Sequence, residues 1–150
     1  MKAKLVVAAL MLAFWTFPSI AQAPWDLVTA EENARDNAAP HVPGPPDLPS
    51  PPEIVLLRPD ISQAIRNPVT VEAQFRAGPN RTIDMGSFRA TYGWLGIDIT
   101  RRLLEHATKT PNGLSAENVD IPPGSHRITL SIADTSGKRA SRTFRFSVVQ

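Results

Sequence analysis

The side chains of this sequence that could do chemistry are few and widely spaced. His106 and His126 lie far apart, and neither has a second ligand at metal-binding spacing. Zinc sites bring several His, Cys or carboxylate ligands together, and the sequence contains no cysteine. We therefore expect no metal site, and we interpret His126 as a half-buried histidine on the inward face of a strand.

Four aspartates stand beside predicted turns: Asp84, Asp98, Asp120 and Asp134. Loop carboxylates can bind calcium, which is the alternative interpretation, but the sequence contains no EF-hand pattern. An aspartate before a turn commonly accepts hydrogen bonds from its own backbone. We favour this structural role for all four.

Nucleophilic catalysis has no motif to support it. Serines are plentiful, but none stands in a Gly-x-Ser-x-Gly elbow, and no serine is paired with a histidine and an acid. There is no glycine-rich phosphate loop and no thiol. The sequence therefore predicts a protein that is not an enzyme and that needs no cofactor.

The candidate binding residues are Tyr92, Trp94 and Leu95, which stand at a turn flanked by Gly93 and Gly96. An aromatic side chain held out on a glycine-hinged loop can stack on a sugar ring or anchor a partner protein. The structural alternative is that Trp94 folds over the end of the core.

The element on which the fold depends is a predicted β-hairpin over residues 124–149. Apolar and polar side chains alternate on both sides of Thr135-Ser136-Gly137, which is the pattern of two paired strands with one buried face. A three-residue loop with Gly137 in the left-handed region sets Ile132 opposite Ala140 and Ile128 opposite Phe144. Arg142 then points inward, either at the rim with its head in water or at a bulge.

Upstream of the hairpin, short alternating segments separated by Gly, Pro and Asn turns indicate further strands of a sandwich. They cover residues 54–57, 69–75, 88–92 and 97–98. A helical turn is expected within residues 98–108, capped by Asp98 or Thr100. Residues 109–116 are predicted as loop and residues 117–121 as a short edge strand.

The N-terminal third divides into two segments. Residues 1–21 have a basic start, a short apolar run and small residues before the expected cut, as in a secretory signal peptide. An uncleaved membrane anchor is the alternative, although the run is short for a spanning helix. Residues 22–52 are predicted as a disordered acidic and Pro-rich linker, with a brief solvated helical tendency around residues 28–38 that Thr29 would cap.

Charge is nearly balanced over the whole chain, with 16 Lys and Arg against 14 Asp and Glu. The linker is acidic and the body, residues 53–150, is basic. Because the arginines are interleaved along strands rather than clustered, we expect no nucleic-acid binding. We also expect no stable membrane insertion after the signal peptide is removed.

Three stretches of the body resemble bacterial immunoglobulin-like modules of exported and cell-surface proteins: residues 83–89, 96–100 and 121–146. The sequence departs from these modules at Lys138, where asparagine is frequent, and in the helical character of residues 101–108. The resemblance implies an all-β, antiparallel sandwich of about seven strands with one short helical turn, behind a disordered Pro-rich arm. It also implies a non-catalytic module of the bacterial periplasm or cell exterior, which binds another cell-envelope or extracellular protein. The alternative is a small carbohydrate-binding module that uses Tyr92 and Trp94.

Overall fold

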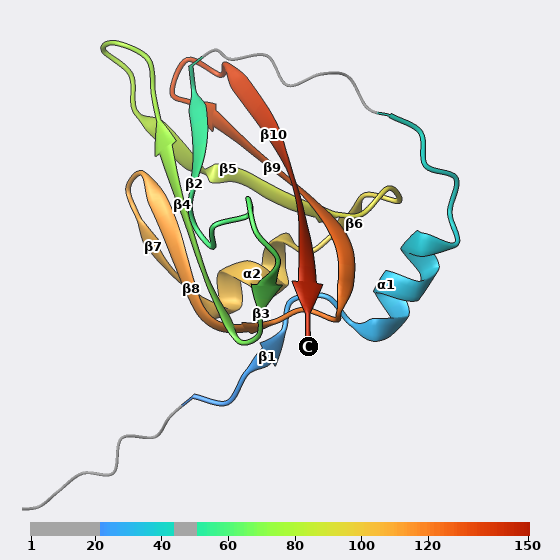
Figure 1. Cartoon of the computed structure of the whole chain (residues 1–150). Helices are drawn as coiled ribbons and strands as arrows, with labels where there is room; N and C mark the ends of the chain where they lie inside the picture. Colours follow the sequence, from blue (N-terminus) through green and yellow to red (C-terminus); the bar gives the residue numbers. More distant parts are fainter. Residues whose placement is uncertain (1–21, 44–50) are drawn as a thin grey trace, which may run out of the picture.

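The computed structural model describes residues 22–43 and 51–150, and it consists mainly of strands in two layers (Figure 1). Within these residues there are ten strands and two helices. The strands are β1 (Trp25–Asp26), β2 (Glu53–Arg58), β3 (Ile65–Arg66), β4 (Val69–Arg76), β5 (Ile83–Tyr92), β6 (Ile97–Asp98), β7 (Ala107–Thr110), β8 (Gly113–Asp120), β9 (Gly124–Asp134) and β10 (Arg139–Val149). The helices are α1 (Ala30–Asn37) and α2 (Thr100–His106).

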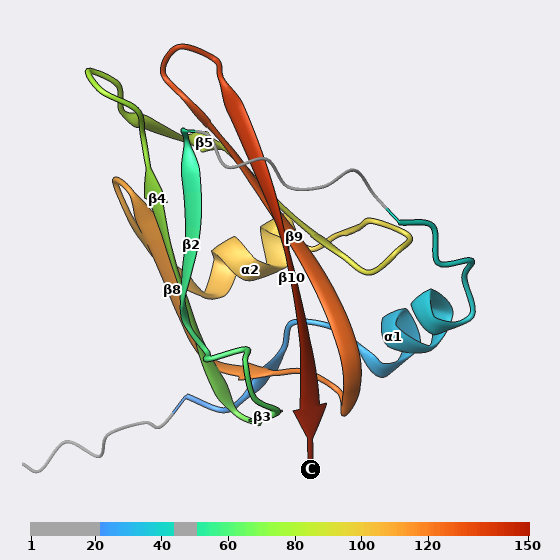
Figure 2. The same cartoon turned by 45° about the horizontal axis from the view of Figure 1, so that its top comes forward.

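The strands form two sheets that face each other (Figure 2). The buried apolar side chains of both sheets form one core cluster. One sheet has the order β1-β8-β4-β2, with β7 also paired to β8, and the other has the order β3-β10-β9-β5-β6. The predicted all-β sandwich is therefore confirmed. It is not purely antiparallel, because the short strands β1 and β3 pair in parallel with β8 and β10.

The hairpin of β9 and β10 has the predicted register. Ile132 pairs with Ala140 and Ile128 pairs with Phe144. The Asp134 N–H donates to the Lys138 carbonyl over 2.9 Å, and Gly137 has a φ of 81°. A glycine tolerates this left-handed conformation without steric cost, so the turn chemistry and the buried face select the same pairing.

Arg142 takes the first of its two predicted arrangements. It stands on the inward side of β10 opposite Leu130, at the rim, and its side chain is exposed. The Arg142 Nη1 donates to the Ile54 carbonyl of β2 over 2.8 Å. The guanidinium therefore connects the two sheets where the sandwich opens to solvent.

The segment from residue 107 to residue 120 differs from the prediction. Residues 109–116 are not a loop: β7 and β8 form a hairpin, and β8 lies inside its sheet, against β4. Asn118 has a φ of 54°, and the β4–β8 register shifts between Val69 and Val71. The buried positions consequently change from 114 and 116 to 119. This bulge breaks the two-residue period, which is why alternation alone misses a strand of this length.

The predicted helical turn after Asp98 is α2. Its N-cap residue is Ile99, which makes no side-chain cap. The Asp98 Oδ1 instead accepts the Thr100 N–H over 2.8 Å, and Leu103 packs in the core. Asp98 therefore caps the helix as expected, but it does so from the position before the N-cap residue.

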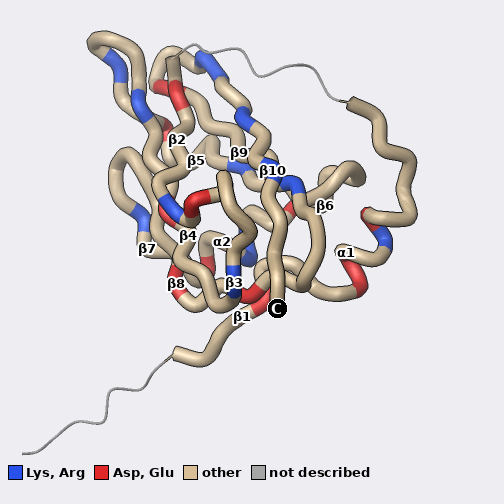
Figure 3. The backbone as a smooth tube through the Cα atoms, in the orientation of Figure 1, with Lys and Arg blue, Asp and Glu red and all other residues tan. Residues whose placement is uncertain are grey.

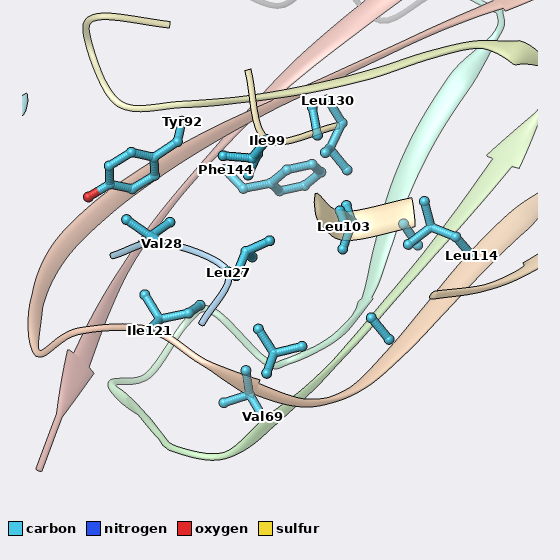
Figure 4. Close-up of a cluster of buried hydrophobic side chains, with 14 of the residues drawn as sticks. Leu27, Val28, Val69, Tyr92, Ile99, Leu103, Leu114, Ile121, Leu130 and Phe144 are labelled. Carbon is cyan, nitrogen blue, oxygen red and sulfur yellow. The ribbon is translucent and has the colours of Figure 1, made fainter. Parts of the chain in front are cut away.

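The N-terminal segment requires a correction. Residues 25–38 were predicted as part of a disordered linker, yet they form β1 and α1 and contribute to the core. The Leu27 N–H donates to the Asp120 carbonyl over 3.0 Å, and the side chains of Leu27 and Val28 are buried between the sheets. Figure 4 shows both side chains among core residues of other elements. Two consecutive apolar residues are too few to show a side-chain period. The sequence pattern therefore does not predict their burial, which results from the packing of the two sheets around them.

Two of the expected segments lie outside the described residues: the signal peptide at residues 1–21, and residues 44–50 of the Pro-rich linker. Among the described residues, neither helix is long and apolar enough to cross a membrane.

The burial of Leu27 generates the first prediction. We expect Leu27→Ala to lower the free energy of unfolding by about 2–5 kcal/mol, because it leaves a cavity between the sheets. Val42→Ala, at a side chain that is 72% exposed, serves as the control and should have almost no effect. Urea unfolding of both variants measures the difference. Equal midpoints for the two variants would show that the N-terminal segment is a dispensable linker after all.

Candidate functional site

The loop between β5 and β6 carries the candidate residues Trp94 and Leu95, and a carboxylate of α1 holds it in place. The Oδ1 of Asp36 accepts the N–H of Trp94 over 2.5 Å and the N–H of Leu95 over 2.9 Å. Asp36 is itself buried. A charged acceptor makes stronger hydrogen bonds than a neutral one, so one side chain fixes the loop backbone.

Gly93 makes this arrangement possible. Its φ is +72°, and its N–H donates to the Arg127 carbonyl of β9 over 2.8 Å. A Cβ atom at this position would lie 2.2 Å from the Asp36 carboxylate. Only glycine allows both the left-handed backbone and the close approach of the carboxylate.

The Trp94 side chain is half-buried and has two neighbours. The His41 ring is stacked with it at a centroid distance of 4.8 Å, and the Arg127 guanidinium lies 4.1 Å from the Trp94 ring centroid. Trp94 does not belong to the buried core cluster, so it does not cap the core as the structural alternative supposed. Leu95, the next residue, is 49% exposed.

Tyr92 does not lie with these two residues, which corrects its expected exposure. Its ring is in the core, where Figure 4 shows it near Val28. Its hydroxyl lies 2.9 Å from the Asn33 Oδ1 of α1 and 2.9 Å from the His126 Nδ1, and its single hydrogen is donated to one of these two atoms at a time. Burial, together with the negative charges of Asp36 and Glu32, raises the pKa of Tyr92 to about 12. Tyr92 thus attaches α1 to the sheet and presents no surface to a ligand.

His126 lies on the inward face of β9, as predicted, but it is buried rather than half-buried. Its Nε2 is 2.6 Å from the Pro122 carbonyl, to which it donates. Burial lowers the pKa of His126, and the hydrogen bond to Pro122 opposes that effect. Both ring nitrogens have partners within the protein, so His126 joins β5 to the start of β9.

An ion pair secures the other side of α1. The Glu32 carboxylate accepts two hydrogen bonds from Arg102 of α2, over 2.8 and 2.9 Å, and Arg102 also donates to the Leu27 carbonyl. Thr29 and Glu32 form a capping box at the start of the helix, so the prediction that Thr29 caps it is confirmed. The hydrogen bonds from Arg102 lower the pKa of Glu32 from 4.5 to about 2, against the opposing effect of burial.

These contacts leave a cleft with a volume of about 610 Å³ beside Trp94. One wall is formed by Asp36, Asn37, His41 and Trp94, and the opposite wall by residues 61–64. Residues 125–127 of β9 and 145–147 of β10 line the space between the walls. The cleft therefore joins segments that are far apart in the sequence.

The charge of the cleft comes from two arginines. Arg127 of β9 and Arg145 of β10 are directly opposite each other in the antiparallel ladder, and Figure 3 shows basic positions following these strands. Within the described residues neither makes an ion pair. The carboxylate of Asp36 is directed at the loop amides. The register predicted from the sequence already sets residue 127 opposite residue 145, but only the tertiary structure brings residues 61–64 and the end of α1 beside them to make a cleft.

Asp84 and Asp134 have the predicted structural role, because each accepts hydrogen bonds from the backbone of its own turn. Asp84 accepts the Gly86 N–H, and Asp134 accepts the N–H groups of Ser136 and Lys138. The hydrogen bond from the Ser136 side chain lowers the pKa of Asp134. Across residues 22–43 and 51–150, no group of three or more His, Asp or Glu side chains is placed to hold a metal ion.

Fold and site together define a two-sheet sandwich with a basic cleft beside a rigid loop. No protein-family model and no curated protein matches the sequence. Among solved structures, the chain is similar to CopC from Methylosinus trichosporium OB3b, with a TM-score of 0.40 and 13% identity, over 64% of this chain and 93% of that chain. A likeness this weak carries no argument about the ligand or activity of this chain.

The role of Asp36 generates the second prediction. Asp36→Ala leaves the Trp94 and Leu95 amides without an acceptor, and we expect it to lower the free energy of unfolding by about 1–3 kcal/mol. Amide exchange at residues 94 and 95 should also become faster. Glu31→Ala is the control, since its side chain is 81% exposed on the same helix and makes only an i,i+4 ion pair. Unchanged exchange at both amides in the Asp36 variant would contradict this account of the loop.

The pKa of Glu32 generates the third prediction. Because the folded-state value lies below the unfolded one, its contribution to stability is complete above pH 4.5 and is lost as the pH falls toward 2. With allowance for the partly exposed Arg102, we expect this contribution to be about 2 kcal/mol. The difference in unfolding free energy between the wild type and Glu32→Gln should therefore shrink across this pH range. A constant difference would show that the ion pair does not contribute.

Proposed function

We propose that this chain is a non-catalytic, exported binding module that engages a cell-envelope or extracellular protein at the cleft beside Trp94 and Leu95. The observation that carries the proposal is the loop itself. A buried carboxylate and a left-handed glycine hold it in one conformation, next to an open cleft. Residues fixed before binding lose little conformational entropy when a partner docks.

The side chains of the loop have the character of a contact site. Leu95 is one of the few large apolar side chains that are exposed among the described residues, and Trp94 lies beside it with its ring partly accessible. Aromatic anchors with apolar neighbours dominate the energy of protein–protein contacts. A loop that served only to connect β5 and β6 would not require a buried acid to support it.

The polar groups of the cleft support a binding role over a catalytic one. The two ring nitrogens of His126 are bonded to Tyr92 and Pro122. The Oδ1 of Asp36 accepts the two loop amides. A general base needs an acceptor atom that can reach a substrate proton, and both ring nitrogens of His126 are directed at partners within the protein.

Carbohydrate binding is less well supported than protein binding. Tyr92 is buried, and the Trp94 ring already contacts His41 and Arg127. The pair of free aromatic faces that the carbohydrate interpretation requires is therefore absent at this loop.

The fourth prediction tests the location of the contact. A photo-cross-linking residue at position 95 of the exported full chain should give a discrete adduct, whereas one at position 57 should not. Leu57 lies on β2 and is 48% exposed, so it matches Leu95 in size and accessibility. Binding of the captured protein, once purified, should weaken about tenfold in Leu95→Ala, as expected for an apolar side chain buried on docking.

Three controls complete this experiment. Leu57→Ala should bind like the wild type. Trp94→Ala should also weaken binding while the melting temperature stays nearly unchanged, because Trp94 lies outside the core cluster. Equal adducts at positions 57 and 95, or unchanged affinity in Leu95→Ala, would refute the proposed location. Loss of binding after enzymatic deglycosylation of the captured protein would favour a carbohydrate ligand instead.

A further inference from the structure

The cross-strand pair of Arg127 and Arg145 is unusual within this structure. The two residues lie directly opposite each other on β9 and β10, where like charges destabilise a sheet. Their neighbours along the ladder are small and polar: Ser125 pairs with Ser147, and Thr129 pairs with Thr143. Nothing in the pairing of the strands requires two arginines at this position.

The protein does not compensate these charges with its own acids. Among the described residues, Arg127 and Arg145 make no ion pair, as is also true of Arg66, Arg89, Arg139 and Arg142; Arg127 and Arg145 differ in that they face each other across the ladder. The Nε of Arg127 is buried without a hydrogen-bond acceptor. The guanidinium is held instead against the Trp94 ring, at 4.1 Å from its centroid. This contact orients the group and leaves its charge unneutralised.

We propose that Arg127 and Arg145 form a carboxylate-binding pair, and that the cleft takes an acidic peptide segment of the partner protein. This inference rests on the proposed function and states the chemistry of its partner. Guanidinium groups bind carboxylates in a planar, two-point geometry, and two guanidinium groups side by side can hold one or two acidic side chains. An apolar residue next to the acidic ones would then meet Leu95.

The surroundings favour a peptide over other anions. The described part of the cleft supplies Gln63, Ser125 and Ser147, whose polar side chains can bond a peptide backbone, whereas the Ser62 hydroxyl already donates to Asp60. A nucleic acid would need a longer track of basic residues and a free aromatic face for its bases. Here the arginines are a single pair, and the Trp94 ring is covered in part by His41.

The test uses a fluorescein-labelled hexapeptide, Glu-Leu-Glu-Glu-Leu-Glu, and the same peptide with glutamine in place of glutamate. Fluorescence anisotropy should show binding of the acidic peptide only, weakening as salt is added. Arg127→Gln and Arg145→Gln should each lower the affinity about tenfold, as expected for the loss of one charge-assisted contact. Arg139→Gln removes the same charge from β10 outside the cleft, and it should leave the affinity within about twofold of wild type.

A charge reversal separates binding from folding. Arg145→Glu replaces the like-charge pair by an opposite-charge pair with Arg127, so it should raise the melting temperature while it abolishes peptide binding. Arg145→Glu leaves Arg127 and its contact with Trp94 in place, so a loss of peptide binding in this variant reports on the charge of the pair. A lower melting temperature together with retained peptide binding would overturn the proposal.

Each remaining outcome decides the question. Equal binding of the two peptides, no acidic-peptide binding at millimolar concentration, or an equal loss in Arg139→Gln would refute the carboxylate pair. Tighter, Arg127-dependent binding of inorganic phosphate, heparin or oligo-dT would assign the site to another anion and refute the peptide. A partner that cross-links at position 95 and binds Arg127→Gln and Arg145→Gln normally would refute this inference and leave the proposed function in place. Arginine-dependent peptide binding without any adduct at position 95 would support the carboxylate-binding pair and refute the proposed contact at Leu95.

Discussion

The structure depends on the burial of Leu27 and Val28 between the two sheets. These residues occupy the end of the apolar layer, where they meet core side chains from both sheets and from α2 (Figure 4). Their burial fixes where the chain leaves the core, and α1 begins immediately afterwards. Since α1 carries Asp36, the position of the loop with Trp94 and Leu95 follows from a packing requirement at residues 27 and 28. Fold and candidate site are therefore parts of one arrangement.

The polar side chains around α1 divide into two groups with different roles. Half-buried Asn33 and buried His126 both lie within hydrogen-bond distance of the Tyr92 hydroxyl, and Glu32 is paired with Arg102. These groups satisfy one another, so their cost of burial is offset and they define how α1 sits on the body. Arg127 and Arg145 lie close by without such partners. Two arginines directly opposite each other on neighbouring strands, beside a hydrogen-bonded network, are the feature that marks this cleft.

Bulges and short segments explain where prediction from the sequence failed. The hairpin of β9 and β10 could be predicted in register because its alternation is long and its turn contains glycine. In β8 the left-handed Asn118 shifts the buried positions by one, so the period breaks, and the first half of the strand is predicted as loop. The contribution of Leu27 and Val28 was missed because two residues contain no period. Tyr92 was placed on the surface because it precedes a turn, although it continues the inward face of β5.

The sequence by itself determined the sandwich class, the hairpin register, the capping role of Thr29 and the turn containing Trp94 and Leu95. Each of these depends on residues that are near one another in the chain, where side-chain period and turn chemistry act locally. Only the tertiary structure decided that Asp36 supports that turn, that Tyr92 faces the core, and that Arg127 and Arg145 share one cleft with residues 61–64. Such relations depend on how the sheets pack and on which registers their edges adopt, and local preferences do not encode that geometry.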